Sequence, residues 1–176
     1  MENLLQRLTS ALFGAFQSPS AAPRTFAACT RGSRISFNRS PFVHHFYNEE
    51  GDEVYTGQSL ENKVTYGFIT CHLAKPLSDL MLAEQRLFLF LESLHPHFEI
   101  ECTTGLDHGL SHPVNPDVVG MTEYWQDAKG YDWKVQAWTD GSLMAVTYVR
   151  NINITDFRKQ DAFLDSFAFP SVRNLV

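Results

Sequence analysis

The residues best suited to chemistry lie in a long polar segment, residues 105–117, which contains the stretch D-H-G-L-S-H at 107–112. Asp107, His108 and His112 carry ligand types that zinc accepts, and His95 or His97 would add another if the chain folds back. A zinc site needs about three or four converging ligands, and the spacing does not establish convergence. We therefore expect a polar loop with incidental histidines. A small metal-dependent or small-molecule enzyme that uses the Asp107–His112 loop is the alternative.

Other catalytic arrangements have less support in the sequence. Ser111 lies close to Asp107 and His108, but neighbours in sequence seldom form a hydrolase triad, and the chain has no G-x-S-x-G turn. Cys102 has acidic neighbours, which disfavour a reactive thiolate. We therefore predict no catalytic residue and no cofactor, and an enzyme is less expected than a binding protein.

Several aromatic and charged residues could instead contact a partner or a ligand. Trp138 lies beside a predicted turn, on a strand face of mixed polarity that also carries Lys134. Trp125 shares a strand face with Glu123. Large exposed rings at such positions are typical of contact surfaces. Trp138, Trp125, Glu123 and Lys134 are therefore the predicted partner- or ligand-binding residues.

The overall composition limits the class of partner. The chain has 176 residues and a formal net charge of −6, whereas a general nucleic-acid binder usually shows a basic face. We expect no membrane span, because no apolar run approaches the necessary length, and we recognise no secretory signal. Cys29, Cys71 and Cys102 form no C-x-x-C motif. We expect free thiols in a reducing, cytoplasmic setting.

Residues 131–152 form the segment around which we expect the fold to be organised. Two β-rich runs flank Asp140-Gly141, a dipeptide typical of two-residue hairpin turns. If these two residues are the whole loop, Thr139 pairs with Ser142. Alternation along the strands then predicts a single apolar face, which comprises Trp133, Val135, Ala137, Met144, Val146 and Tyr148. The opposite face is mixed, as expected beneath a partial cover.

The rest of the chain divides into three regions. Residues 1–17 are expected to form an amphipathic helix, residues 18–24 a connector rich in Ser, Ala and Pro, and residues 25–176 one α+β domain. Besides the hairpin, we expect strands within 25–37, 42–47, 53–55, 62–74, 98–104 and 118–126, a long helix over 77–94 and a last helix after Thr155 or Asp156. This order predicts a mainly antiparallel β-sheet flanked by helices.

The hairpin sequence W-T-D-G-S-L-M-A-V-T-Y-V-R-N and the later D-A-F-L-D-S-F-A-F-P resemble those of PsbP-like proteins, over roughly residues 60–170. In that family a long hairpin leads into a closing helix with a similar end. The resemblance implies an α/β/α sandwich and a mostly non-catalytic protein that docks on other proteins. It carries over no functional residue, because no functional motif is matched.

We therefore predict a non-catalytic binding or adaptor protein whose partner is another protein. The helix over 77–94 is apolar around most of its circumference. Such a helix is usually buried in its own protein and otherwise forms a partner surface. A structural homodimer formed through the N-terminal helix is a further alternative.

Overall fold

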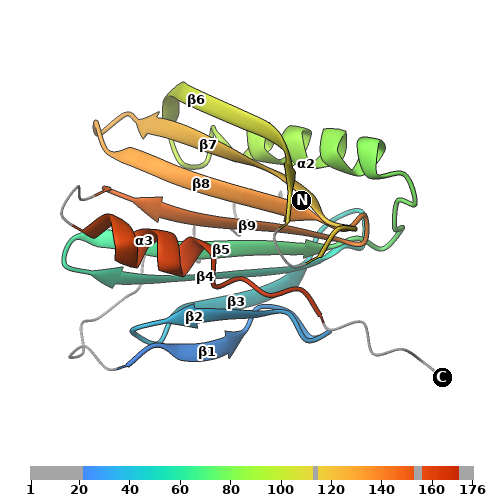
Figure 1. Cartoon of the computed structure of the whole chain (residues 1–176), viewed down its shortest axis with the longest axis horizontal. Helices are drawn as coiled ribbons and strands as arrows, with labels where there is room; N and C mark the ends of the chain where they lie inside the picture. Colours follow the sequence, from blue (N-terminus) through green and yellow to red (C-terminus); the bar gives the residue numbers. More distant parts are fainter. Residues whose placement is uncertain (1–21, 113–114, 153–155, 171–176) are drawn as a thin grey trace.

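The computed structural model describes residues 22–112, 115–152 and 156–170 (Figure 1). The amphipathic helix predicted for residues 1–17 lies outside these described residues, so the homodimer based on it stays a prediction. The described part of the chain forms one large antiparallel sheet, one two-stranded sheet and two helices. The predicted mainly antiparallel sheet with flanking helices is confirmed.

The large sheet has seven strands in the order β3-β4-β5-β9-β8-β7-β6. Their bounds are β3 (Phe42–Tyr47), β4 (Glu53–Glu61), β5 (Val64–His72), β6 (Ile100–Ser111), β7 (Val119–Asp127), β8 (Asp132–Thr139) and β9 (Leu143–Arg150). The chain leaves β5, crosses to the far edge at β6 and returns strand by strand until β9 pairs with β5. The strand predicted within 62–74 is confirmed as β5, an interior strand that is almost wholly buried.

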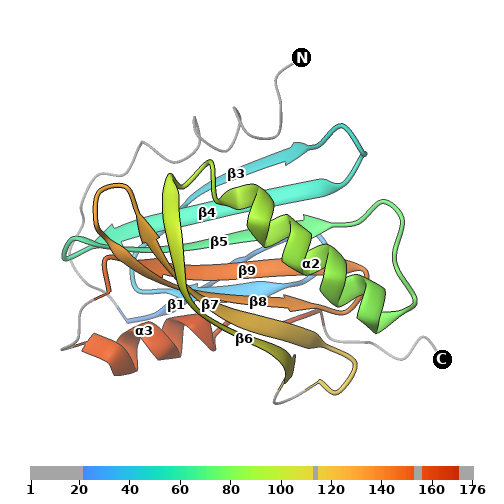
Figure 2. The same cartoon turned by 90° about the horizontal axis from the view of Figure 1, so that it is seen from above.

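Different elements cover the two faces of the sheet (Figure 2). Helix α2 (Leu80–Leu94) covers one face, and the other face carries α3 (Phe157–Leu164) together with β1 (Arg24–Ala27) and β2 (Arg34–Phe37). Under α2, the core is built on the predicted apolar face of the β8–β9 hairpin, whose six members all belong to it. Under α3 and β2, the core contains Ile35, Phe37, Phe68, Leu143, Ala145, Phe163, Leu164 and Phe167.

The predicted register of the β8–β9 hairpin is wrong by two residues. Thr139 pairs with Met144 rather than with Ser142. The Asp140 carboxylate accepts hydrogen bonds from the backbone N–H groups of Ser142 and Leu143, each at 2.8 Å, and this local turn lengthens the loop. Gly141 has a positive φ of 83° but Asp140 does not, so the turn is not type I′. Because a shift of two residues preserves alternation, the predicted faces remain correct.

The irregular segment predicted over residues 105–117 is also wrong in part, because residues 100–111 form edge strand β6. Its pairing with β7 contains three register shifts, the last one around Gly109, which has a φ of +68°. Such irregularities hide an edge strand from pattern analysis and also discourage pairing with another chain. Strand β4 is likewise longer than the predicted 53–55, since it extends to Glu61.

The structure places the start of α2 later than the sequence prediction and shows how each helix begins. Helix α2 starts at Leu80 rather than Leu77, and the side chain of Asp79, which precedes it, accepts hydrogen bonds from the Met81 and Leu82 N–H groups. Asp156 precedes α3, but its side chain makes no capping hydrogen bond. Phe157, the first residue of α3, is 49% exposed.

Close strand packing at Gly120 provides a test of the register. Gly120 lies opposite Trp138, and a Cβ atom there would overlap the Trp138 ring and the Ala137 carbonyl oxygen. We expect Gly120→Ala to lower the free energy of unfolding by about 1–3 kcal/mol, because the backbone oxygen cannot rotate away. Urea denaturation measures this change.

Gly105→Ala is the matched control. Its Cβ atom would lie 3.4 Å from the Tyr124 ring, an ordinary contact, so we expect a change within about 0.5 kcal/mol. Equal stabilities of the two variants would contradict the pairing of β7 with β8.

Candidate functional site

Trp125 and Glu123 share a face of β7, as predicted, but both are only 1% exposed. The Trp125 indole N–H donates a hydrogen bond to the Glu123 carboxylate, and the His95 ring packs edge-on against Trp125 at 4.9 Å. The His95 Nε2 atom lies 3.7 Å from the same carboxylate. Trp125 and Glu123 therefore belong to the interior beneath α2 and not to an exposed surface.

Trp138 is also buried, at 6% exposure. The absence of a side chain at Gly120, its cross-strand neighbour, leaves room for the indole ring, and the His112 ring lies against it at 5.0 Å. Phe169 packs against the other side of this histidine at 5.8 Å. The prediction that Trp138 presents a large exposed ring is therefore wrong.

Lys134 braces α3 against the sheet. Its Nζ atom donates a hydrogen bond to the Asp161 carboxylate at 2.8 Å. Burial would lower the pKa of Lys134, but the hydrogen bond from this ammonium to Asp161 outweighs it and raises the pKa. The contacts of Lys134 explain how α3 is positioned, and they do not form an open binding site.

The residues of the predicted metal loop do not come together. Asp107 and His108 are exposed on edge strand β6, whereas His112 is half-buried between Trp138 and Phe169. Burial lowers the pKa of His112. Within the described ranges, no three His, Cys, Asp or Glu side chains gather closely enough to hold a metal ion. The geometry therefore offers no support for the metal alternative.

The outer face of α2 departs from ordinary burial. Four large apolar side chains of this helix point to solvent, with exposures of 78% for Met81, 53% for Leu82, 37% for Phe88 and 59% for Leu89. They lie within about two and a half helical turns, opposite the buried residues Ala83, Leu87, Leu91 and Leu94. We call Met81, Leu82, Phe88 and Leu89 the α2 stripe.

Polar contacts on both flanks fix the orientation of the α2 stripe. On one flank, the Glu84 carboxylate accepts a hydrogen bond of 2.8 Å from the Gly109 N–H in β6. On the other flank, Arg86 pairs with Glu50 in the turn between β3 and β4. These contacts hold the helix between the two edges of the sheet, and the apolar side chains between them are directed outward.

The start of α2 is held by the β8–β9 turn. The Leu77 N–H donates a hydrogen bond of 2.8 Å to the Gly141 carbonyl, and the Leu73 N–H donates one of 2.9 Å to the Ser142 carbonyl. A Cβ atom at residue 141 would overlap the Leu77 carbonyl oxygen. Glycine therefore permits both the positive φ and this close approach.

An acidic pocket of about 350 Å³ adjoins the α2 stripe. It lies between α2 and the β3–β4 turn, and Leu89 belongs to both features. Three carboxylates, those of Glu49, Glu50 and Asp52, line it together with the Arg86 guanidinium. The pocket thus places excess negative charge beside an exposed apolar surface.

The floor of this pocket is rigid and chemically unreactive. Asp52 is 4% exposed, and its carboxylate accepts hydrogen bonds from the Ala74 N–H at 2.8 Å and from the Asn48 side chain at 3.0 Å. Burial, followed by the charge of Asp52, raises the pKa of the Cys71 thiol to about 12. Cys71 therefore stays protonated at neutral pH and is no nucleophile.

The acidic pocket could not be predicted from the sequence, and the role of the long helix stayed open. Residues 48–52 form a recognisable acidic turn, but their approach to α2 depends on tertiary packing. The all-round apolar pattern of the helix indicates an unusual surface without identifying which side is exposed. Only the packing of Leu87 and Leu91 against the sheet defines the α2 stripe.

Comparisons with known proteins give no functional assignment: no family model and no curated protein matches the chain. Within the residues that the structure describes, no helix has the length and apolar character required to cross a membrane.

Thiol accessibility tests the description of the pocket floor. Cys71 and Cys29 are buried, whereas Cys102 is exposed on β6. We expect iodoacetamide to modify Cys102 in the native protein and to reach Cys71 only after unfolding, because burial both shields its thiol and disfavours the thiolate. Peptide mass spectrometry measures the sites, and Cys102→Ser is the control that should abolish native labelling. Rapid native modification of Cys71 would contradict the pocket geometry.

Proposed function

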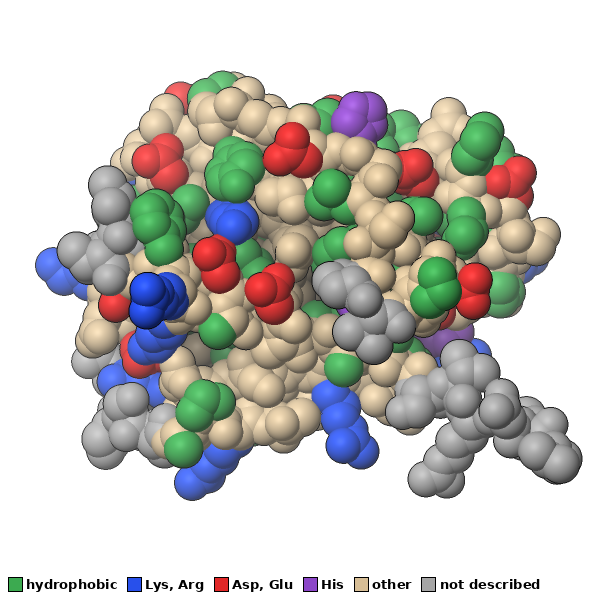
Figure 3. Space-filling model, viewed as in Figure 1, with side chains coloured by type: hydrophobic (Ala, Val, Ile, Leu, Met, Phe, Trp, Pro, Cys, Tyr) green, Lys and Arg blue, Asp and Glu red, His purple; other side chains and the backbone are tan. Residues whose placement is uncertain are grey.

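We propose that this chain is a non-catalytic binding or adaptor protein that docks another protein on the α2 stripe. The observation that carries the proposal is the exposure of Met81, Leu82, Phe88 and Leu89 on a helix that is otherwise packed and braced. A group of large exposed apolar side chains on a braced element is typical of an interaction site. Over α3 and the β1–β2 sheet, by contrast, hydrophobic side chains form separate spots among polar and charged groups (Figure 3).

The chemistry of the α2 stripe suits a protein partner. Burial of a Leu, Met or Phe side chain contributes about 1.5–3 kcal/mol, so a few such residues at the centre of an interface can dominate binding. Helix α2 is held by Glu84 and Arg86 at its flanks, which limits the entropy that a partner would have to remove. A partner would therefore meet a preformed apolar surface.

The acidic pocket specifies the partner further. A partner segment that combines apolar side chains with a nearby Lys or Arg would match both the stripe and the carboxylates of Glu49 and Glu50. Complementary charge of this kind favours correct orientation and faster association. The excess of acidic residues in the whole chain, with its net charge of −6, supports the same preference.

The fold also supports a PsbP-like α/β/α sandwich as part of this proposal. The antiparallel sheet has α2 on one face and α3 on the other, and the β8–β9 hairpin leads to α3, as that resemblance implies. A mostly non-catalytic family of docking proteins agrees with a binding role. The cytoplasmic location predicted from the free cysteines remains part of the proposal.

Charged substitutions on the α2 stripe test the proposed function. We expect Leu82→Asp and Leu89→Asp each to reduce recovery of the bound partner more than tenfold, because each buries a carboxylate in an apolar interface. Affinity purification of the tagged full chain from its source cells, after cross-linking and with quantitative mass spectrometry, measures recovery. The free energy of unfolding should change by less than about 0.5 kcal/mol, since both side chains are exposed.

Phe157→Asp is the matched control. It makes the same kind of change at a similarly exposed residue of α3, and we expect it to leave recovery unchanged. Equal recovery with wild type, Leu82→Asp and Leu89→Asp would refute docking through α2.

A further inference from the structure

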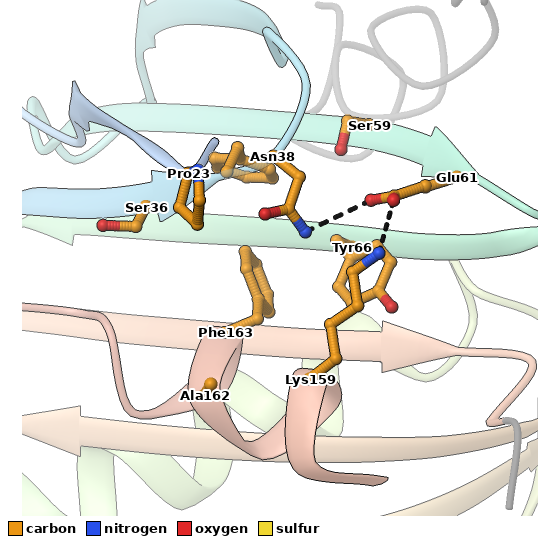
Figure 4. A pocket seen from close by; sticks show the side chains of 10 residues that line it. Pro23, Ser36, Asn38, Ser59, Glu61, Tyr66, Lys159, Ala162 and Phe163 are labelled. Carbon is orange, nitrogen blue, oxygen red and sulfur yellow. Dashed lines mark hydrogen bonds and ion pairs between the residues drawn. The ribbon is translucent and has the colours of Figure 1, made fainter. Parts of the chain in front are cut away.

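A second cavity, on the opposite side of the sheet from α2, has the features of a small-molecule site. It encloses about 120 Å³ between β2, β4, β5 and α3 (Figure 4). The rings of Phe37 and Phe163 provide an apolar wall. Polar groups of Asn38, Ser59 and Lys159 line the remainder.

The charged groups of the cavity neutralise each other. Glu61 is 4% exposed, and one of its carboxylate oxygens pairs with Lys159 of α3. Its other oxygen accepts a hydrogen bond of 3.3 Å from the Asn38 side-chain amide. Figure 4 shows these three side chains directed toward one another, from β4, from α3 and from the residue that follows β2. An incoming ion would have to be desolvated without a free counter-charge, so the cavity disfavours ions.

Several hydrogen-bonding groups of the cavity have no partner in the described part of the chain. The Ser59 hydroxyl is one of them, although Ser59 is only 5% exposed. The oxygen of the Asn38 amide is another, because only its nitrogen is engaged. Lys159 uses one of three N–H groups on Glu61, and Tyr66 contributes a hydroxyl. These groups line the cavity and are therefore available to hydrogen-bond a polar molecule inside it.

The size and the polar groups together define the ligand class. At roughly 30 Å³ per water molecule, 120 Å³ holds about four to six non-hydrogen atoms. Lys159, Ser59 and Tyr66 offer donors to a carbonyl oxygen, and the Asn38 oxygen accepts from an N–H group. Burial raises the pKa of Tyr66 to about 12, so its hydroxyl remains a donor at neutral pH.

We propose that this cavity binds a small uncharged primary amide, with the carbonyl toward Lys159 and the apolar end against Phe37 and Phe163. A free amide and the end of a glutamine side chain share this chemistry. The proposal is independent of docking on α2, because the two sites lie on opposite faces of the sheet.

Protein-observed NMR on the ¹⁵N-labelled full chain tests the proposal, with propionamide as the probe and propionate as its charged counterpart. We expect propionamide to give saturable shifts of the Asn38, Ser59 and Glu61 amides, and propionate to bind at least tenfold more weakly. N-acetylglutamine N-methylamide distinguishes the source: tighter binding than propionamide identifies a peptide side chain, and weaker binding identifies a free amide.

Two variants make the test specific. Ala162 is exposed at the rim of the cavity, and Ala162→Leu should close the cavity and weaken propionamide binding at least tenfold without unfolding α3. Ser59→Ala should weaken it about threefold to tenfold through the loss of one hydrogen bond. Ala128→Leu, an exposed site in the β7–β8 turn, is the control. Unsaturable shifts, equal binding of propionate, or unchanged binding to Ala162→Leu would each overturn the proposal.

Discussion

The described structure depends on the contact between the β8–β9 turn and the segment that leads from β5 into α2. Hydrogen bonds from Leu73 to Ser142 and from Leu77 to Gly141 join the two, and only glycine at residue 141 permits the approach. Because β5 and β9 are also paired in the middle of the sheet, this contact aligns the start of α2 with the centre of the fold. The orientation of the α2 stripe therefore originates in a turn that is distant from it in sequence.

The two faces of the sheet are covered in different ways, and the difference explains where binding surface remains. On one face, α3 and the β1–β2 sheet together cover the core. Reciprocal backbone hydrogen bonds between Arg34 and Ala168 attach the chain after α3 to β2. On the other face, α2 is the helix that covers the core. The inner residues of α2 complete that core, whereas the α2 stripe on its outer side is apolar without contributing to the core. A side chain that contributes nothing to the core yet stays apolar on the surface is more easily explained by binding than by folding.

Local alternation predicted much of the fold correctly. The six residues of the hairpin face and the buried strand β5 could be predicted from the sequence, because successive side chains of a strand point to opposite faces of the sheet. The register itself could not, since it depends on how the Asp140 carboxylate binds the backbone of the turn. The length of β6 was hidden by its irregular pairing.

The candidate sites were harder to predict because they depend on pairings between distant segments. Trp138 was expected at the surface, and its burial follows from the absence of a side chain at Gly120 on the neighbouring strand. The approach of Lys159 to Glu61 joins residues separated by 98 positions. An all-round apolar helix signals that a surface is unusual, but the exposed side becomes known only when its packing is known.

Oxidation of methionine measures the state of the α2 stripe most directly. Met81 is 78% exposed, whereas Met121 and Met144 are each 2% exposed and serve as internal controls. Under mild hydrogen peroxide treatment, followed by peptide mass spectrometry, we predict rapid oxidation of Met81 in the purified full chain and protection of Met81 in extracts of its source cells. Met121 and Met144 should remain reduced in both. Equal reactivity of Met81 in the purified protein and in the extract would contradict docking through the α2 stripe.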